Sequence, residues 1–277
     1  MTTTSTATTT ASADEAARIG LRIAATDAFA VAGRYLTHLR RQPRLLVFST
    51  IQPVMFVLLF VYVFGGALER SPLLGQYNSY KDFLLPGIFV QSVAFGSTQT
   101  AVALAEDLAK GVIDRFRSLP MARSAVLAGR TLSDLARSLF VITLMALVGL
   151  IIGFRPEFPG ILFAILLVAA FGFAFSWIYA YVGLTVKGSE TAQAASFVVT
   201  FPLVFASAVF VPTDSFPTWL QGFAETVNPI TKAAEASRAL ATGVGDLTGP
   251  LLWTLGWIVV ILAVFVPLSV WRYRKAT

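Results

Sequence analysis

Residues 159–186 read PGILFAILLVAAFGFAFSWIYAYVGLTV, and this run contains no charged side chain from end to end. An α-helix that crosses a bilayer needs about 20 mainly apolar residues, so the run predicts a membrane-spanning helix. Charge-free stretches of similar character occur at residues 45–64, 83–105, 138–154, 191–213 and 247–271. The stretch at 138–154 is short, although Leu132 and Leu135 can extend it. The sequence therefore predicts an all-α, polytopic membrane protein with six transmembrane helices.

The composition of the 277 residues indicates lipid rather than water as the solvent. Apolar residues make up 56% of the chain and charged residues 13%, which is more apolar surface than a soluble globule of this size can bury. The chain has no cysteine and one histidine, His38, which excludes disulfides, thiolate metal sites and histidine-based triads. The net charge of +6 is divided between two membrane sides, which argues against nucleic-acid binding.

The distribution of lysine and arginine predicts which ends of the helices face the cytoplasm. If the N-terminus is inside, 16 of the 21 Lys and Arg residues fall on inner segments and 5 on outer ones. The positive-inside rule therefore predicts a multi-pass protein of the plasma membrane with both termini in the cytoplasm.

Two segments precede the first predicted span. Residues 1–23 start with a threonine-rich run that lacks the apolar content to order it, and we expect a disordered tail. The transmembrane domain then covers residues 24–277. Its first part, residues 24–42, places Phe29, Leu36 and Leu39 near helical spacing beside several arginines. This predicts an amphipathic helix in the cytoplasmic interface, and a solvated linker helix is the alternative.

The inner segment Glu106–Arg137 is dense in charges of both signs. Its apolar residues nevertheless share one helical face: Leu108, Val112, Ile113, Phe116 and Leu119. Such a helix on the cytoplasmic side is suited to docking a soluble partner. A solvated helix folded against its own bundle is the alternative.

The outer segment 213–243 is predicted to hold two short helices. Asp214 or Ser215 would cap the first helix, and Asn228-Pro229 would open the second, which Gly243 would end. The apolar face of the first helix comprises Trp219, Leu220, Phe223 and Val227. Both helices are too short to span, so they either dip into the outer leaflet or form an external loop. If they dip, the charged residues must face water or each other: Glu225, Lys232, Glu235 and Arg238.

Two spans carry side chains suited to lining a transport path. Gln91 and Thr98 lie on a polar stripe of the second span, and Phe197, Phe201 and Phe205 lie four residues apart on one face of the fifth. Helix packing and lipid contact are the commoner explanations of such residues, and both interpretations stay open.

The sequence encodes no energy source of its own. It has no phosphate-binding loop of the form G-x-x-x-x-G-K-[ST], and no predicted span holds an ionisable residue of the kind that carries protons or sodium. Transport would then need a separate ATPase subunit, or the chain is a channel or scaffold. A membrane-embedded enzyme would have only Asp214, Glu225 and Glu235 for its chemistry, so we expect no enzymatic activity and no metal site.

Two groups of residues resemble one known family. The run from Glu106 to Arg123 resembles the signature of type-2 ABC exporter permeases, through Lys110-Gly111, Asp114-Arg115, Arg117-Ser118-Leu119-Pro120 and the later Gly129-Arg130 and Asp134. The outer run from Phe210 to Leu220, followed by Asn228-Pro229, resembles the daunorubicin-resistance (DrrB-like) branch of that family. The opening Arg41-Gln42-Pro43-Arg44 fits as well.

The resemblance implies a permease that pairs with a second, identical or homologous permease and with two copies of a separate ATPase subunit, which binds ATP and Mg. The coupling helix, within residues 106–120, would comprise Glu106, Asp107, Lys110, Gly111, Asp114, Arg115, Phe116, Arg117, Leu119 and Pro120. The outer pair would be re-entrant helices, with Trp219 and Phe223 at an outer gate. Amphipathic drugs, antibiotics or lipids would leave the cell, and polysaccharide or ion export is the alternative within the family.

Overall fold

The computed structural model of the protein describes residue 33 and residues 43–68, 77–111 and 123–275. All regular secondary structure in these residues is helical, as predicted. The α-helices are α2 (Pro43–Leu59), α3 (Gly65–Leu68), α4 (Tyr80–Ala109), α6 (Arg123–Ile151), α7 (Gly160–Thr185), α8 (Ser189–Phe205), α9 (Thr218–Gly222), α10 (Pro229–Thr242) and α11 (Thr248–Lys275). Shorter elements are the π-helices η1 (Phe60–Phe64) and η4 (Phe223–Val227) and the 3-10 turn η3 (Thr213–Ser215). The predicted tail at 1–23 and interfacial helix at 24–42, apart from Gly33, lie outside the described residues.

Four helices of the described chain are long and apolar enough to cross a membrane: α4, Leu127–Ile151 of α6, α7 and α11. They correspond to the predicted spans at 83–105, 138–154, 159–186 and 247–271. The other two predicted spans correspond to shorter helices. α2, η1 and α3 follow one another without a break from Pro43 to Leu68, and α8 has 17 residues.

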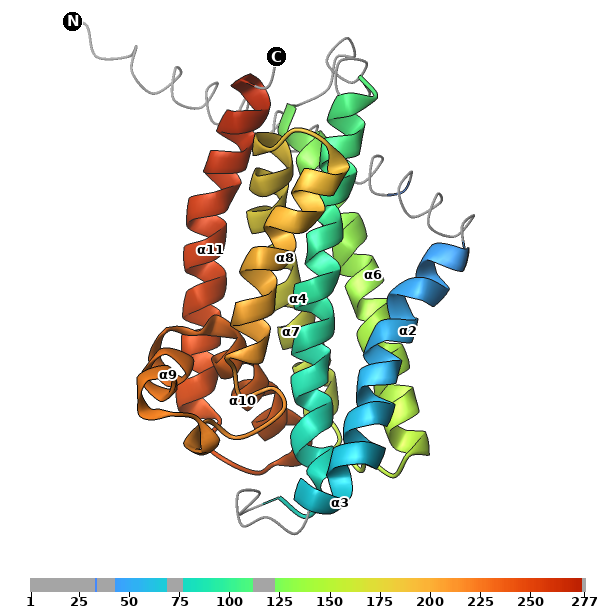
Figure 1. The fold of residues 1–277 in the computed structure, drawn as a ribbon, viewed down its shortest axis with the longest axis vertical. Helices are drawn as coiled ribbons and strands as arrows, with labels where there is room; N and C mark the ends of the chain where they lie inside the picture. The colour runs from blue at the N-terminus through green and yellow to red at the C-terminus, as the bar shows by residue number, and fades with distance from the viewer. Residues whose placement is uncertain (1–32, 34–42, 69–76, 112–122, 276–277) are drawn as a thin grey trace, which may run out of the picture.

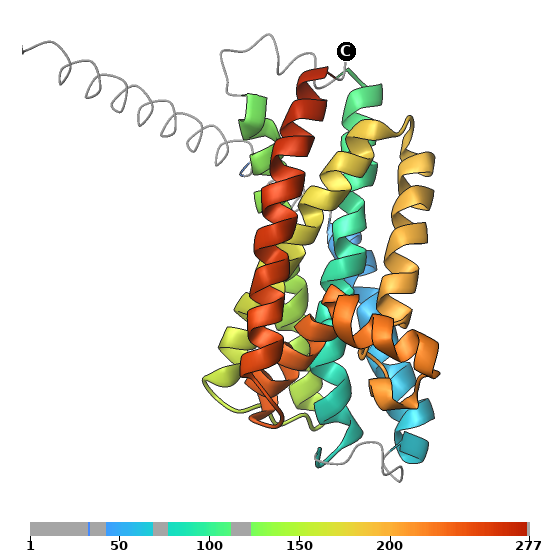
Figure 2. The same cartoon turned by 90° about the vertical axis from the view of Figure 1, so that its left-hand side faces the viewer.

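The long helices lie side by side in one bundle, with α4 near its centre (Figure 1 and Figure 2). The end of α4, the start of α6, the turn between α7 and α8 and the end of α11 gather at the upper end in Figure 1. The end of α6, the start of α7 and the short helices α9 and α10 lie toward the lower end. Helix ends that border the predicted inner segments thus share one end of the bundle.

α4 and α7 pack closely because α7 supplies glycines at their contact. A Cβ added at Gly172 would lie 2.9 Å from the Cβ of Val93, and one added at Gly183 would overlap the carbonyl oxygen of Ala101. Small residues let helix backbones approach in a membrane, where packing rather than the hydrophobic effect drives helix association. This close pair forms the centre of the buried core.

α10 begins and ends as predicted, whereas α9 does not. The side chain of Asn228 caps α10, and Gly243 ends it with a left-handed φ of 67°. The predicted cap of the first outer helix at Asp214 or Ser215 is wrong, because both residues lie in η3. α9 starts only after Pro217 and has no side-chain cap.

α6 begins well before the predicted span at 138–154, so its membrane-length part Leu127–Ile151 includes Arg130, Asp134 and Arg137. The prediction that no span holds an ionisable residue is therefore wrong. Hydropathy alone places the start of this span where the charges end. In the structure these three side chains pair with one another inside the bundle, which is how charged residues are accommodated within membrane helices.

Replacing Gly183 by alanine should weaken the contact between α4 and α7, because the new Cβ has no space. We expect a loss of about 1–3 kcal/mol in stability, the usual cost of overpacking, measured as a lower thermal unfolding midpoint of the detergent-purified protein. The matched Gly256→Ala substitution on α11 places a Cβ with nothing within 4 Å, so its midpoint should not fall. Equal midpoints for both variants would contradict the close approach.

Candidate functional site

The outward face of α8 carries a row of phenylalanines. Phe197, Phe201 and Phe205 are 49%, 44% and 38% exposed, and successive ring centroids are 5.5 and 4.3 Å apart. A spacing of four residues puts side chains on one helix face. The structure therefore presents the three predicted residues as one open aromatic surface.

The stack of rings continues beyond α8 in both directions, and at one end it enters the core, because Phe210 is 6% exposed. The ring of Phe95 on α4 lies 5.7 Å from that of Phe197. At the other end, the ring of Phe210 lies 5.3 Å from that of Phe205 and 4.4 Å from that of Phe60 in η1. Such ring pairs contribute about 0.5–1.5 kcal/mol each beyond their burial. We call the six residues Phe60, Phe95, Phe197, Phe201, Phe205 and Phe210 the phenylalanine row.

The opposite face of α8 holds the helix to the bundle. Its buried residues are Ala192, Ser196, Thr200 and Val204. The hydroxyl of Thr200 lies 2.5 Å from the hydroxyl of Tyr179 on α7. Because this face is fixed against the bundle, the phenylalanines of α8 are left on the outside of the subunit.

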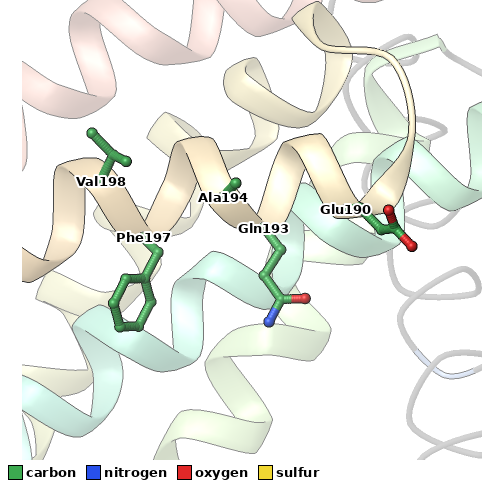
Figure 3. A pocket seen from close by; sticks show the side chains of 5 residues that line it. All are labelled: Glu190, Gln193, Ala194, Phe197 and Val198. Carbon is green, nitrogen blue, oxygen red and sulfur yellow. The ribbon is translucent and has the colours of Figure 1, made fainter.

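An open depression of about 470 Å³ lies on the first half of α8 and is lined by Glu190, Gln193, Ala194, Phe197 and Val198 (Figure 3). All five residues come from this one helix. Gln193 and Phe197 project from one side of α8, and Val198 projects from the other (Figure 3). A carboxylate and an amide followed by apolar side chains are suited to a molecule that has both a polar and an apolar part.

Gln91 and Thr98, the other predicted path residues, lie inside the bundle and do not line this depression. The hydroxyl of Thr98 donates to the carbonyl of Phe95 in its own helix, at 2.6 Å. Helix packing therefore accounts for Thr98. The side-chain oxygen of Gln91 is buried without a hydrogen-bond partner among the described residues, and packing does not explain it.

The carbonyl groups at the end of α8 are satisfied by side chains from other parts of the chain. The amide of Asn228 donates to the carbonyls of Leu203, at 2.7 Å, and Ala206, at 2.8 Å. The hydroxyl of Tyr80 on α4 donates to the carbonyl of Phe210, at 3.0 Å. Because buried carbonyl groups need donors from the protein itself, these donors allow α8 to stop at Phe205, well before residue 213, where the sequence predicted its end.

Arg238 on α10 supplies three further hydrogen bonds. Its Nε donates to the carbonyl of Phe83 at 2.6 Å, and its Nη2 donates to the carbonyls of Ala208 and Val209. The guanidinium carbon lies 3.7 Å from the centroid of the Phe83 ring. Burial lowers the pKa of Arg238 to about 10, so the side chain remains a cation at neutral pH. We call Tyr80, Asn228 and Arg238 the outer clamp.

The prediction that Arg238 faces water or other charged side chains is wrong, because its partners are backbone carbonyls. The other outer charges do find polar partners. Lys232 lies 2.9 Å from Glu235, and Glu225 accepts a hydrogen bond from Gln221 at 3.0 Å. Among the residues that the structure describes, no three His, Cys, Asp or Glu side chains come together as a metal site.

The residues predicted at the outer gate lie on α9 and η4. Trp219 is 77% exposed and Phe223 is 38% exposed. Exposure of this size leaves both side chains free to contact lipid or another molecule, and their gating role stays a prediction.

The end of α4 forms the start of the predicted coupling segment. Glu106 and Asp107 lie in its last turn, and the Nζ of Lys110 lies 2.9 Å from a carboxylate oxygen of Glu106. The hydrogen bond and charge of Glu106 raise the pKa of Lys110. The remaining predicted coupling residues lie outside the described residues: Asp114, Arg115, Phe116, Arg117, Leu119 and Pro120.

Gly111 interrupts the helix that the sequence predicted here. Its φ is 65°, the left-handed conformation that glycine often adopts just past a helix end, and α4 ends at Ala109. The apolar face predicted from Leu108 to Leu119 therefore does not belong to one unbroken helix.

Three charged residues of α6 and a threonine of α4 form a buried cluster. Asp134 accepts a hydrogen bond from the hydroxyl of Thr100 at 2.5 Å, and its carboxylate oxygens lie 3.5 Å from the Nε of Arg130 and 3.7 Å from the Nε of Arg137. The Nη2 of Arg137 donates to the carbonyl of Gly96 at 2.5 Å. We call Thr100, Arg130, Asp134 and Arg137 the inner polar cluster. Positions 130, 134 and 137 share one helix face, and this spacing can be recognised in the sequence as a signal for such a cluster.

Known proteins are similar in sequence to this chain over most of its length. The sequence pattern of ABC-2 type transporters matches residues 26–241. The chain belongs to the ABC-2 type transporter family. The daunorubicin resistance ABC transporter permease protein DrrB1 of Streptomyces coeruleorubidus is 36% identical to it over 253 residues, which cover 87% of this chain and 86% of that protein.

Other ABC-2 permeases are similar at lower identity. The probable doxorubicin resistance ABC transporter permease protein DrrC of Mycobacterium tuberculosis is 28% identical to this chain, and the match covers 88% of this chain and 87% of DrrC. The inner membrane transport permease YadH of Escherichia coli strain K12 is 25% identical to this chain, and the match covers 82% of this chain and 88% of YadH. These similarities confirm the resemblance to type-2 ABC exporter permeases.

Replacing Arg238 by leucine should destabilise the outer end of this ABC-2 protein, because the carbonyls of Phe83, Ala208 and Val209 would lose their donor. Burying unsatisfied groups of this kind costs about 3 kcal/mol, which should lower the thermal unfolding midpoint. Lys232→Ala, which removes only a partly exposed ion pair, should change stability by less than about 1 kcal/mol. Similar midpoints for the two variants would show that Arg238 is not a structural clamp.

Proposed function

We propose that this ABC-2 chain is the transmembrane permease subunit of an ATP-driven exporter, and that a separate ATPase subunit hydrolyses the ATP. Family membership and relatives that are named as permease proteins support the first part. The absence of a phosphate-binding loop from the sequence supports the second part, because uphill transport needs an energy source. The phenylalanine row, whose three rings on α8 are exposed, is the observation that carries the assignment of a substrate path.

The permease in this proposal has six spans. In addition to the four long helices, the unbroken run from Pro43 to Leu68 has a length of about 39 Å, which exceeds the hydrocarbon core of about 30 Å. α8 is about 26 Å long and falls slightly short. The outer clamp completes its end, so that α8 serves as a span while α9 and α10 lie beside it as re-entrant helices.

Both termini face the cytoplasm of the cell in this proposal. The last turn of α11 carries Arg272, Arg274 and Lys275, and it lies at the same end of the bundle as the start of α6 and the end of α4 (Figure 1). A concentration of cations at one end is the pattern of the cytoplasmic side.

The substrate is an amphipathic drug, antibiotic or lipid that moves out of the cell. Glu190 and Gln193 provide polar contacts in the depression on α8, and Phe197 provides an apolar one. The remaining phenylalanines lead from there toward η1 and would support stepwise movement of an apolar molecule. Relatives named for daunorubicin and doxorubicin resistance favour a drug over a polysaccharide or an ion.

A second permease subunit, identical or homologous, faces the phenylalanine row. The depression is lined by one helix alone, so a bound molecule requires another wall. Phe201 and Phe205, which are 44% and 38% exposed, extend an apolar surface on this face. Exposed apolar patches of a membrane subunit are covered either by lipid or by a partner. With a partner, two rows would enclose a path that opens outward past Trp219 and Phe223.

Two copies of the ATPase subunit, with bound ATP and Mg, would dock on residues 106–120 of the two permeases. Glu106 and Lys110 lie at the end of α4 with side chains that reach solvent. A mixed-charge surface of this kind gives specificity in docking. ATP-driven closure of the ATPase pair would then push on the segment that joins α4 to α6.

Reversing a charge in the docking segment, by Asp114→Arg or Arg115→Glu, should abolish co-purification of the ATPase with the tagged permease from membranes. The folded bundle should survive, because the change lies in the inner segment. Arg155→Glu, on the outer connection between α6 and α7, is the control and should retain the ATPase. Variants at 114 and 115 that co-purify and export normally would refute the docking assignment.

Replacing Phe201 by alanine should reduce export of doxorubicin, measured as higher fluorescence retained in cells that express the permease and its ATPase. Loss of one aromatic contact of about 1 kcal/mol corresponds to a roughly fivefold effect. Phe163 on α7 is 57% exposed but lies outside the row, and Phe163→Ala should export normally. Equal export by both variants would remove the row from the path.

A further inference from the structure

The inner polar cluster joins α4, whose last turn forms the start of the proposed docking segment, to α6. α4 ends at Ala109 and α6 begins at Arg123, with the rest of the segment between them. Thr100 lies about 14 Å below the end of α4, and Asp134 lies about 17 Å below the start of α6, at 1.5 Å per residue. The two side chains therefore meet inside the bundle, at similar distances from the helix ends that border the segment.

Three of the four cluster residues are buried, and the cluster contacts backbone as well as side chains. Thr100 is fully buried, and Asp134 and Arg137 are 5% and 9% exposed. Arg137 reaches the carbonyl of Gly96, which is part of the main chain of α4. A Cβ added at Gly96 would lie 3.3 Å from the Nη2 of Arg137, so glycine leaves the guanidinium the space for this contact.

Stability alone is a weak reason for this arrangement. Desolvating a carboxylate and two guanidinium groups costs much of what their attraction contributes, and apolar residues of similar volume often stabilise as well or better. Buried ionic contacts have strict geometry, however, and hold one relative position of the elements that they join. The cluster is therefore better suited to fixing α6 on α4 than to strengthening the fold.

The same part of α4 touches the phenylalanine row. Phe95 is the residue next to Gly96, and its ring lies 5.7 Å from that of Phe197 on α8. A displacement that reaches Gly96 through Arg137 would thus act directly on the contact between α4 and the row. The chain of contacts runs from α6 through Asp134 and Arg137 to α4, and from there to α8.

We propose that Asp134 is a positioning residue that locks α4 and α6 into one lever, which carries a push at the inner ends of these helices to the Phe95–Phe197 contact. This inference rests on the proposed function only in that the ATPase supplies that push. The lever holds its internal geometry while it moves, so the distance between the inner halves of α4 and α6 stays constant through the ATP cycle. Without the lock, ATP hydrolysis continues but is no longer converted into export.

The first test uses purified permease–ATPase complexes in vesicles and measures ATP hydrolysis and doxorubicin export together. Asp134→Asn should retain the ATPase and its hydrolysis, while export per ATP falls about tenfold. Because Asp134→Asn leaves two buried arginines unbalanced, Thr100→Val serves as the second variant: it keeps every charge and should lower export per ATP about threefold. Thr131→Val is its matched control, since that hydroxyl bonds only to carbonyls of its own helix among the described contacts, and should export normally.

The outcomes separate the two proposals. If the unmodified chain neither retains an ATPase nor exports, the proposed function fails. If it does both, and Thr100→Val exports as well as Thr131→Val, the lever is refuted. A fall in bound ATPase, hydrolysis and export in equal proportion would also refute it, because that pattern indicates a merely structural role.

A distance measurement tests the lever in the unmodified cluster. The chain has no cysteine, so spin labels can be attached to Ala103→Cys on α4 and Ala128→Cys on α6 without further changes. Electron paramagnetic resonance should give the same distance distribution in nucleotide-free and ATP-bound complexes, and a broader one in the Asp134→Asn background. A shift of the distance on ATP binding with the cluster intact would overturn the inference.

Discussion

A helix end that is buried away from water must find donors for its last carbonyl groups within the protein, and in this protein that constraint acts at α8. The helix stops at Phe205, and the carbonyls that follow are bonded by Asn228, Arg238 and Tyr80. α10 must therefore start at the end of α8 and pack against α4, so that its cation can reach these carbonyls. The constraint extends to Gly87, where an added Cβ would lie 2.6 Å from the carbonyl oxygen of Val209 and 2.9 Å from Arg238.

The same constraint decides which surface of the subunit stays open. α8 is held along its buried face through Thr200 and at its end by the outer clamp, so its phenylalanines have no place inside. Phe210 is fixed through its carbonyl by Tyr80, and its ring joins the α8 rings to Phe60 of η1. The phenylalanine row is thus set by polar contacts at the end of α8 as much as by ring stacking.

Features that depend on local chemistry could be predicted from the sequence. The long charge-free runs predicted α4, α7 and α11. Asn228-Pro229 predicted the start of α10, and Gly243 predicted its end. Features that depend on distant partners could not. Nothing near Arg238 indicates that its acceptors are the carbonyls of Phe83 and Ala208, and hydropathy starts a span where charges end, so it misplaced the start of α6. The helical spacing of Arg130, Asp134 and Arg137 was a signal that the sequence did contain. Three charged residues on one helix face, next to an apolar run, indicate a buried cluster inside a helix rather than a loop.

α4 links the two polar arrangements, and this determines where it can deform. Its outer end is bonded at Phe83 to the outer clamp, and its inner half is bonded at Gly96 and Thr100 to α6. If the inner half moves with α6 while the outer end stays clamped, the difference must be taken up between Gly87 and Gly96. That stretch contains Gln91, whose buried oxygen lacks a partner among the described residues, and it ends at Phe95, which touches the row. A helix that is hydrogen-bonded near both ends would therefore bend in the region from which it contacts α8. A force at the inner end of the bundle would then displace the phenylalanine row rather than the outer clamp.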